Sequence, residues 1–254
     1  HETLLAYLVR RLLENGANSS FVNQIVDPDV PLERLLEDPV TTARPFAGTA
    51  HPRVPVPAAL YPDRRNSRGI DLTDEHALAA LETALAAAAR ENWLAGPMLA
   101  EAEPTVGQSL PVRSPADPRI VVGHVTEATP GDVAGAIAIA RGAAAWHATT
   151  PAQRAAILDG AADLLEQDMA RFIHLAVHEA GKTLPNAIGE VREAVDFCHY
   201  YAVRVREEPL ASPLGVVACI SPWNFPLAIF IGQVAAALAA GNSVLAKPAE
   251  QTPL

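Results

Sequence analysis

The first helix-like stretch of the sequence places four polar side chains on one helical face. They are Tyr7, Arg10, Arg11 and Glu14, at positions i, i+3, i+4 and i+7. Two guanidinium groups beside a phenol suit the bidentate binding of a carboxylate. The pattern is also typical of a solvated face with an Arg10–Glu14 ion pair, although Arg before Glu is the weaker orientation. Spacing alone favours the solvated face.

A second chemical feature is an asparagine in the least charged part of the chain. Residues 220–230 are ISPWNFPLAIF, and no Asp, Glu, Lys or Arg lies between Glu208 and Lys247. Burying an amide without a partner costs about 1–3 kcal/mol, so Asn224 is either satisfied by its surroundings or available for chemistry. A fixed amide N–H can stabilise a developing oxyanion. The alternative is a turn asparagine that bonds its own backbone, which the residues alone favour.

The elements around Asn224 are those of a βαβ unit. The run 214–220 (LGVVACI) is typical of a strand covered on both faces, Leu227–Ala240 has the length of a helix, and Ser243–Ala246 indicates a second strand. This order predicts an α/β domain with a parallel sheet. SPWNFP is then the turn at the carboxyl end of a parallel strand, where ligands of open α/β sheets bind.

The residues that flank Asn224 suggest how its turn is held. Pro222 and Pro226 stiffen the turn, and proline also suits the opening of the following helix. We expect Trp223 and Phe225 to pack around the turn and to fix the direction of the Asn224 amide.

Upstream of this unit the sequence predicts one strand and several helices. The strand is 120–125 and the helices are 74–92, 130–147, 150–181 and 185–207. We expect Thr73 to cap the first of these helices, and Thr150 with Pro151 to open the third. Residues 17–72 lose helical periodicity and gather eight prolines, which predicts an extended connector laid over a larger body.

The composition and net charge of the chain exclude some classes of function. The chain has 254 residues, 50% of them hydrophobic, and a net charge of -10 that argues against nucleic acid or an anionic membrane as main partner. The uncharged region is interrupted, and its longest helical piece, Leu227–Ala240, is shorter than the roughly 20 residues of a membrane span. Cys198 and Cys219 lie in apolar contexts without CxxC spacing. We expect two core cysteines, no disulfide, no metal site, no signal peptide and a cytoplasmic location.

The segment YLVRRLLENGANSSFVN resembles the last barrel helix of the proline dehydrogenase domain in the bifunctional proline utilisation A family. That family's motif, an Arg-Arg pair followed by Glu-Asn, matches Arg10, Arg11, Glu14 and Asn15. The resemblance implies that both arginines bind the carboxylate of proline, that Tyr7 lines the substrate pocket, and that Glu14 lies on the side of FAD. Residues 51–81 also resemble that family's connector. The rest of the barrel has no counterpart in this sequence.

Three further segments, SPLGVVACISPWNFPLAIF, AALAAGNSVLAKPAEQTPL and EAGKTL, resemble the aldehyde dehydrogenase superfamily over about residues 104–254. The resemblance implies that Asn224 is the catalytic oxyanion-hole residue and that Lys247 and Glu250 hold the adenosine ribose of NAD. Ser221 and Trp223 would line the same cofactor path. The family's catalytic cysteine and general-base glutamate lie downstream of KPAE and have no counterpart in this sequence.

These resemblances imply three parts: the C-terminal helix of a flavin-binding (βα)8 barrel (1–28), an extended connector with one helix (29–103), and the first half of a Rossmann-like NAD-binding domain (104–254). The implied parent oxidises proline to pyrroline-5-carboxylate with FAD and glutamate γ-semialdehyde to glutamate with NAD. It would be a homo-oligomer with a peripheral membrane or quinone contact through its flavin domain. Two alternatives stay open: a stand-alone aldehyde dehydrogenase with an extended N-terminus, and a non-catalytic nucleotide-binding or assembly module.

Overall fold

The structure is a computed structural model that describes residues 8, 9, 12, 20–47, 49, 54–99, 107–207 and 212–254. The chain divides into two units, His1–Val56 and Pro57–Leu254. In the first unit Leu8, Val9 and Leu12 are helical and exposed. The predicted carboxylate-binding residues Tyr7, Arg10, Arg11 and Glu14 lie outside the described residues, as does Asn15.

The first unit contains short helices that the sequence did not predict. They are α2 (Phe21–Val26), α3 (Leu32–Leu35), α4 (Pro39–Ala43) and the 3-10 helix η1 (Arg44–Phe46). Ser20 and Asp38 cap α2 and α4 by accepting backbone N–H groups. The expectation that residues 17–72 form an extended segment is therefore wrong for this stretch. The helices have at most six residues, less than two turns, so no periodicity could reveal them.

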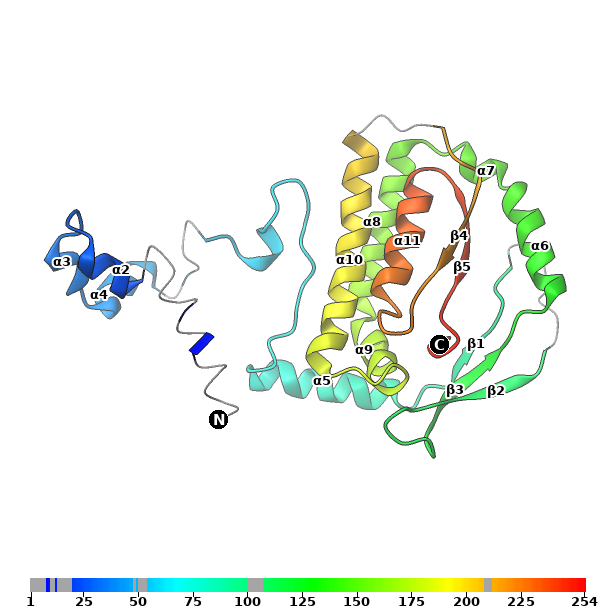
Figure 1. Cartoon of the computed structure of the whole chain (residues 1–254), viewed down its shortest axis with the longest axis horizontal. Coiled ribbons are helices and arrows are strands. Elements are labelled where there is room, and N and C mark those ends of the chain that lie inside the picture. Colours follow the sequence, from blue (N-terminus) through cyan, green and yellow to red (C-terminus); the bar gives the residue numbers. More distant parts are fainter. Residues whose placement is uncertain are drawn as a thin grey trace. The chain divides into compact units, whose positions relative to one another are not determined.

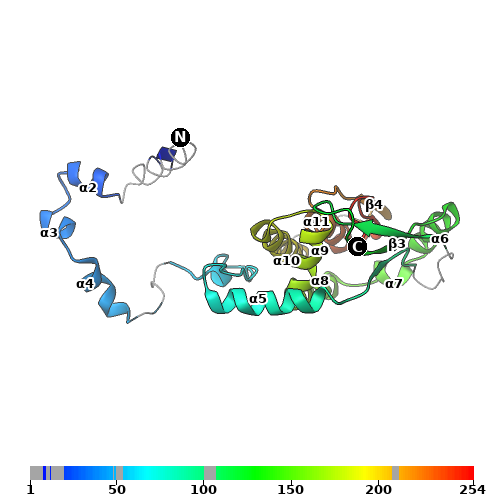
Figure 2. The same cartoon turned by 90° about the horizontal axis from the view of Figure 1, so that it is seen from below.

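The second unit has a helical layer beside two small sheets (Figure 1). Its long helices are α8 (Pro151–Gln167), α10 (Leu184–Glu207) and α11 (Ala228–Ala239), which pack on one another. The helices α5 (Glu75–Ala88) and α9 (Met169–His178) pack together at the end of this layer (Figure 2). The hydrophobic core lies between these helices, and its fully buried side chains include Ile173, Val191 and Val195.

The two sheets differ in topology. The strands β1 (Trp93–Ala95), β2 (Ser109–Arg113) and β3 (Val121–Thr126) form one sheet in the order β1-β3-β2, with β2 antiparallel to β3. The strands β4 (Val216–Ile220) and β5 (Ser243–Lys247) pair in parallel. The helix α11 connects β4 to β5 and contacts both strands. The helix α6 (Pro130–Arg141) also contacts both strands. The predicted parallel βαβ unit is confirmed.

Two predicted helices are each divided in two. The helix predicted over 130–147 breaks at Gly142 into α6 and α7 (Ala144–His147), and the helix predicted over 150–181 breaks at Asp168 into α8 and α9. The Thr150–Pro151 start is confirmed, since Thr150 and Gln153 form a capping box.

The cap predicted for α5 was wrong by one residue. Asp74, not Thr73, accepts the N–H groups of His76 and Ala77. Thr73 is engaged elsewhere, because its N–H and hydroxyl both donate to Asp71.

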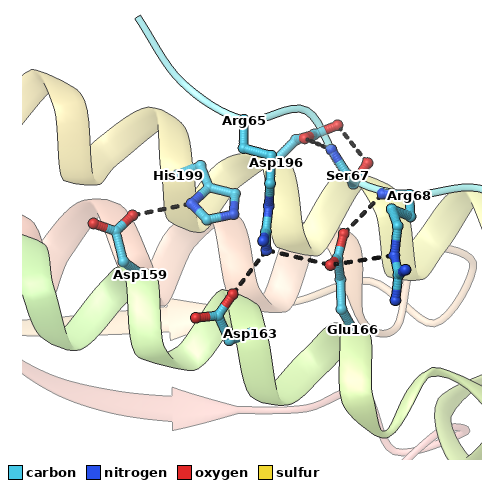
Figure 3. Close-up of polar contacts among 8 residues, drawn as sticks. All are labelled: Arg65, Ser67, Arg68, Asp159, Asp163, Glu166, Asp196 and His199. Carbon is cyan, nitrogen blue, oxygen red and sulfur yellow. Dashed lines mark hydrogen bonds and ion pairs between the residues drawn. The ribbon is translucent and has the colours of Figure 1, made fainter. Parts of the chain in front are cut away.

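Residues 65–68 lie along the faces of α8 and α10 and bind them through polar contacts (Figure 3). Arg65 Nη2 lies 2.7 Å from Asp163 Oδ1, and Arg68 N lies 2.7 Å from Glu166 Oε1. Ser67 is fully buried, and both its N–H and its hydroxyl donate to Asp196 at 2.8 Å. This segment is therefore bound to the helical layer of the second unit. Within the described ranges, no helix is both long enough and apolar enough to cross a membrane.

Candidate active site

The predicted aldehyde-site residues gather where the two parallel strands end. The last pair in the register is Ile220 with Lys247, and the pairing continues as Ser221 N donates to Lys247 O at 3.2 Å. The turn that carries Asn224 and the loop that carries Glu250 therefore leave the sheet at the same edge. This is the position at which open α/β sheets bind ligands.

Asn224 lies in the turn between β4 and α11 with an exposed side chain. Its amide forms no hydrogen bond to any residue that the structure describes, so the alternative of an asparagine bonded to its own turn is not observed. A primary amide that is not used by the fold can donate to a ligand.

The aromatic neighbours of Asn224 are partly exposed. The side chain of Trp223 is 54% exposed and that of Phe225 is 39% exposed. Neither ring encloses the amide, and the expectation that their packing fixes its direction stays a prediction. The turn is instead held at its far end, where the carboxylate of Glu190 accepts the N–H groups of Leu227 and Ala228.

Lys247 and Glu250 form an ion pair after β5. Lys247 Nζ lies 2.7 Å from Glu250 Oε1 and also donates to the carbonyl of Pro248 at 3.0 Å. The hydrogen bond from Lys247 lowers the pKa of the Glu250 carboxyl. Both side chains are exposed, and exposed ion pairs contribute little to stability. The pair therefore offers one charged donor and one charged acceptor that a ligand can engage at small cost.

Ser221 adds a hydroxyl to the same edge. Its side chain is 6% exposed, and its Oγ has no hydrogen-bond partner among the described residues. A buried hydroxyl without a partner is unfavourable, and binding a polar ligand group would satisfy it.

The two cysteines are core residues, as the sequence predicts. Cys198 is packed within the helical core, and burial raises the pKa of its thiol to about 11. Burial also raises the pKa of the Cys219 thiol, which is 3% exposed in β4. Neither thiol has the character of a nucleophile, which requires a thiolate. Among the described residues, no cluster of His, Cys, Asp or Glu could hold a metal ion.

Comparison with known families identifies the second unit. Residues 102–254, more than half of the chain, match the model of the aldehyde dehydrogenase family. The chain belongs to the aldehyde dehydrogenase family. Residues 1–24 match the proline dehydrogenase model. Members of the first family are oxidoreductases, and the two families together imply the use of NAD and flavin.

The curated relatives of this aldehyde dehydrogenase segment include much longer proteins. The bifunctional protein PutA of Escherichia coli (strain K12) is 58% identical over 265 residues, which cover 100% of this chain and 20% of that protein. The protein of the same name from Rhizobium meliloti is 53% identical over 258 residues, covering 100% of this chain and 21% of that protein. The chain thus spans about a fifth of the length of these relatives.

Solved structures show the same fold. Proline utilization A from Bdellovibrio bacteriovorus, inactivated by N-propargylglycine, aligns with a TM-score of 0.71 and 34% identity over 97% of this chain and 27% of that one. The 1-pyrroline-5-carboxylate dehydrogenase from Thermus with bound NAD aligns with a TM-score of 0.68 and 30% identity, over 74% of this chain and 40% of that one. The predicted α/β fold is confirmed.

Sequence reasoning missed two residues beside the aldehyde dehydrogenase turn, Lys182 and Glu190. Their charged groups lie 2.6 Å apart, and both side chains are largely buried. A signal was present, because Glu190 is a carboxylate within the apolar pattern of a predicted helix and Lys182 belongs to the EAGKTL segment. Buried charges of this kind are rare unless they are paired.

Proposed function

We propose that the chain is a segment of a bifunctional oxidoreductase that converts proline to pyrroline-5-carboxylate and then oxidises glutamate γ-semialdehyde to glutamate. The observation that carries the aldehyde half is the free amide of Asn224 at the same sheet edge as the Lys247–Glu250 pair. The proline half rests on the Arg-Arg-Glu-Asn resemblance and on relatives that match all of this chain.

In the aldehyde step the chain would supply an oxyanion donor. A cysteine thiolate of the parent protein would attack the aldehyde carbon, and the carbonyl electrons would move onto its oxygen. Asn224 would donate an amide N–H to that oxygen and stabilise its growing charge, an effect typically worth about 3–4 kcal/mol. Because the amide has no hydrogen bond to break with the residues that the structure describes, this donation requires little rearrangement.

The residues at this edge fit the ribose of NAD, whose hydroxyls can both donate and accept hydrogen bonds. Lys247 would donate to the diol and Glu250 would accept from it. Ser221 offers a hydroxyl on the same path that has no partner among the described residues. Trp223, which is half exposed beside them, is proposed to line this path. When bound, NAD would accept the hydride released by the substrate.

The proline half of the proposal uses residues outside the described part of the chain. Arg10 and Arg11 would bind the carboxylate of proline, Tyr7 would line its pocket, and Glu14 would lie toward FAD. Bidentate guanidinium–carboxylate pairing supports the first of these roles.

The proposed parts of the chain are a barrel end (1–28), a connector (29–103) and the start of the aldehyde dehydrogenase domain (104–254). The family matches over residues 1–24 and 102–254 support the two outer parts. By the same resemblance we assign the parent to the cytoplasm, as a homo-oligomer with a peripheral membrane or quinone contact made by its flavin domain. A stand-alone aldehyde dehydrogenase is less well supported, since the semialdehyde dehydrogenase of Bacillus subtilis matches only 58% of this chain.

Two assays of the full-length protein test the proposal. Proline should reduce an artificial electron acceptor in the absence of NAD, and glutamate γ-semialdehyde should reduce NAD in the absence of proline. A full-length protein with the second activity alone would favour the stand-alone dehydrogenase. One that binds NAD but has neither activity would favour the non-catalytic module.

A further inference from the structure

A buried carboxylate lies directly behind the turn that carries Asn224. Glu190, on α10, is 2% exposed, and its Oε2 accepts the backbone N–H groups of Leu227 at 3.3 Å and Ala228 at 2.9 Å. These N–H groups belong to the start of α11 and have no partner within that helix. Glu190 therefore caps α11 from another helix and fixes the residues that end the turn.

The second oxygen of this carboxylate binds a lysine. Lys182 Nζ lies 2.6 Å from Glu190 Oε1. The same Nζ lies 4.6 Å from the centre of the Phe225 ring, within the range of a cation–π contact. Phe225 directly follows Asn224 in the chain, so Lys182 contacts the middle of the turn while Glu190 holds its end.

The position of Lys182 is itself well defined. It follows Gly181, whose φ of 68° is a left-handed conformation that glycine adopts without strain. The backbone N–H of Lys182 donates to the carbonyl of Ala176 at 3.1 Å, which closes the end of α9. The backbone that carries the lysine is therefore held against the end of α9.

These contacts tie α10 and the segment that follows α9 to the turn that carries Asn224. The Asn224 amide has no hydrogen bond to the described residues, and the side chain of the neighbouring Trp223 is 54% exposed. The point at which the Asn224 side chain leaves the chain, and the direction of its Cα–Cβ bond, are therefore set by the backbone of the turn, which Lys182 and Glu190 hold at two points. Misplacing a reacting group by about 1 Å can cost about 100-fold in rate.

We propose that Lys182 and Glu190 are positioning residues that orient the Asn224 amide toward the reacting aldehyde oxygen. The inference rests on the proposed aldehyde dehydrogenase function. It assigns the two residues an effect on kcat, whereas a pair that only caps a helix would affect stability alone.

The test is a double-mutant comparison in the full-length protein. The variants are Glu190→Gln, Lys182→Met and Asn224→Ala, each alone, together with the Glu190→Gln/Asn224→Ala double variant. Glu190→Gln should lower kcat for semialdehyde oxidation by roughly 10–100-fold, with little change in KM for NAD. In the double variant, Glu190→Gln should cause no further loss, because the group that it positions is already gone.

Asp196→Asn is the matched control. Asp196 is also a carboxylate on α10 that accepts a backbone N–H from another segment, at 2.8 Å from Ser67, and its hydrogen-bond partners among the described residues do not include the turn. Asp196→Asn should lower Tm while kcat for aldehyde oxidation stays at the wild-type value. Lys182→Arg, which keeps the charge, should retain most of the kcat that Lys182→Met loses.

The outcomes separate the inference from the proposed function. Wild-type kcat in Asn224→Ala would refute the oxyanion role itself. If Asn224→Ala does lose activity, wild-type kcat in both Glu190→Gln and Lys182→Met would overturn the positioning role. The same conclusion would follow if the fold-losses in kcat of Glu190→Gln and Asn224→Ala multiplied in the double variant. If Glu190→Gln fails to fold, proline oxidation will also be lost. The kcat values of Lys182→Met and Lys182→Arg then test the positioning role: a loss in the first variant that the second largely restores supports it, and equal values overturn it.

Discussion

Asn224 is the side chain on which the proposed aldehyde chemistry depends, and its removal gives a direct test. In the full-length protein, Asn224→Ala should lower kcat for semialdehyde oxidation by about 10²–10³-fold, the usual effect of losing one oxyanion donor. The affinity for NAD should change little, because the proposed ribose contacts belong to Lys247 and Glu250. Steady-state kinetics of both half-reactions check this.

Proline oxidation is the control for Asn224→Ala, since that site would lie in another domain. The opposite pattern, full kcat with a depressed Tm, would mean that the asparagine serves the turn and not the chemistry. The structure makes this pattern unexpected, because the Asn224 amide forms no hydrogen bond with the described residues.

A second residue-scale prediction concerns the buried Glu179 at the end of α9. Burial raises the pKa of its carboxyl from 4.5 to about 7, although the N–H of Leu254 donates to it at 2.8 Å. Between these pH values the folded chain binds more protons than the unfolded chain. Its stability therefore falls as pH rises through this window, by on the order of 3 kcal/mol from this group.

Urea unfolding of this chain between about pH 5 and pH 8 measures the effect. Glu179→Gln keeps an acceptor for Leu254 but does not titrate, so the variant should gain stability relative to the wild type as pH rises. Parallel pH profiles for the two proteins would show that Glu179 ionises normally.

The position of a site residue could be predicted from the sequence where a local motif determines it. It could not be predicted where the packing of distant segments determines it. The shared sheet edge of Asn224 and Lys247 follows from the βαβ order, and the structure has it. The partnership of Lys182 with Glu190 could not be derived, because the angle between the segment after α9 and α10 decides which side chains meet.

At the scale of elements, local sequence signals predicted where helices start better than they predicted where helices are interrupted. Thr150 and Pro151 predicted the start of α8 because capping is a local interaction. The break at Asp168 was missed, since the apolar pattern continues across it and tertiary packing of α9 decides the bend. Periodicity likewise cannot detect a helix such as α3, which has four residues.

The contact between α10 and α11 gives a prediction at this scale. A Cβ on Gly232 would lie 2.9 Å from two ring atoms of Phe197, so glycine permits the two helices to approach closely. Gly232→Ala should therefore destabilise the chain by about 1–3 kcal/mol, the typical cost of overpacking. Denaturant unfolding measures the loss.

Gly160→Ala in α8 is the matched control. A Cβ there would meet no described atom within 4 Å, so the higher helix propensity of alanine should stabilise the chain by about 0.5–1 kcal/mol. If Gly232→Ala stabilises the chain as Gly160→Ala does, the close approach at Gly232 does not constrain the packing.

At the scale of the whole molecule, the proposed proline site and aldehyde site should respond independently to substitution. In the full-length protein, Arg10→Met or Arg11→Met should raise KM for proline strongly, because a bound carboxylate would lose a bidentate partner worth on the order of 2–5 kcal/mol. Semialdehyde oxidation should stay near the wild-type rate. Unchanged proline kinetics in both variants would indicate that this helical face is merely solvated.

The burial of the two cysteines has a practical consequence for chemical labelling. Cys198 and Cys219 are 2% and 3% exposed, and burial raises the pKa of each thiol. Alkylating reagents act on thiolates that they can reach, so both sulfurs should stay unmodified while the fold is intact. In the full-length protein, rapid alkylation at neutral pH would therefore report cysteines outside this segment. If an aldehyde substrate slows this alkylation, the modified cysteine is the proposed nucleophile, and Cys198 and Cys219 do not contribute to the signal.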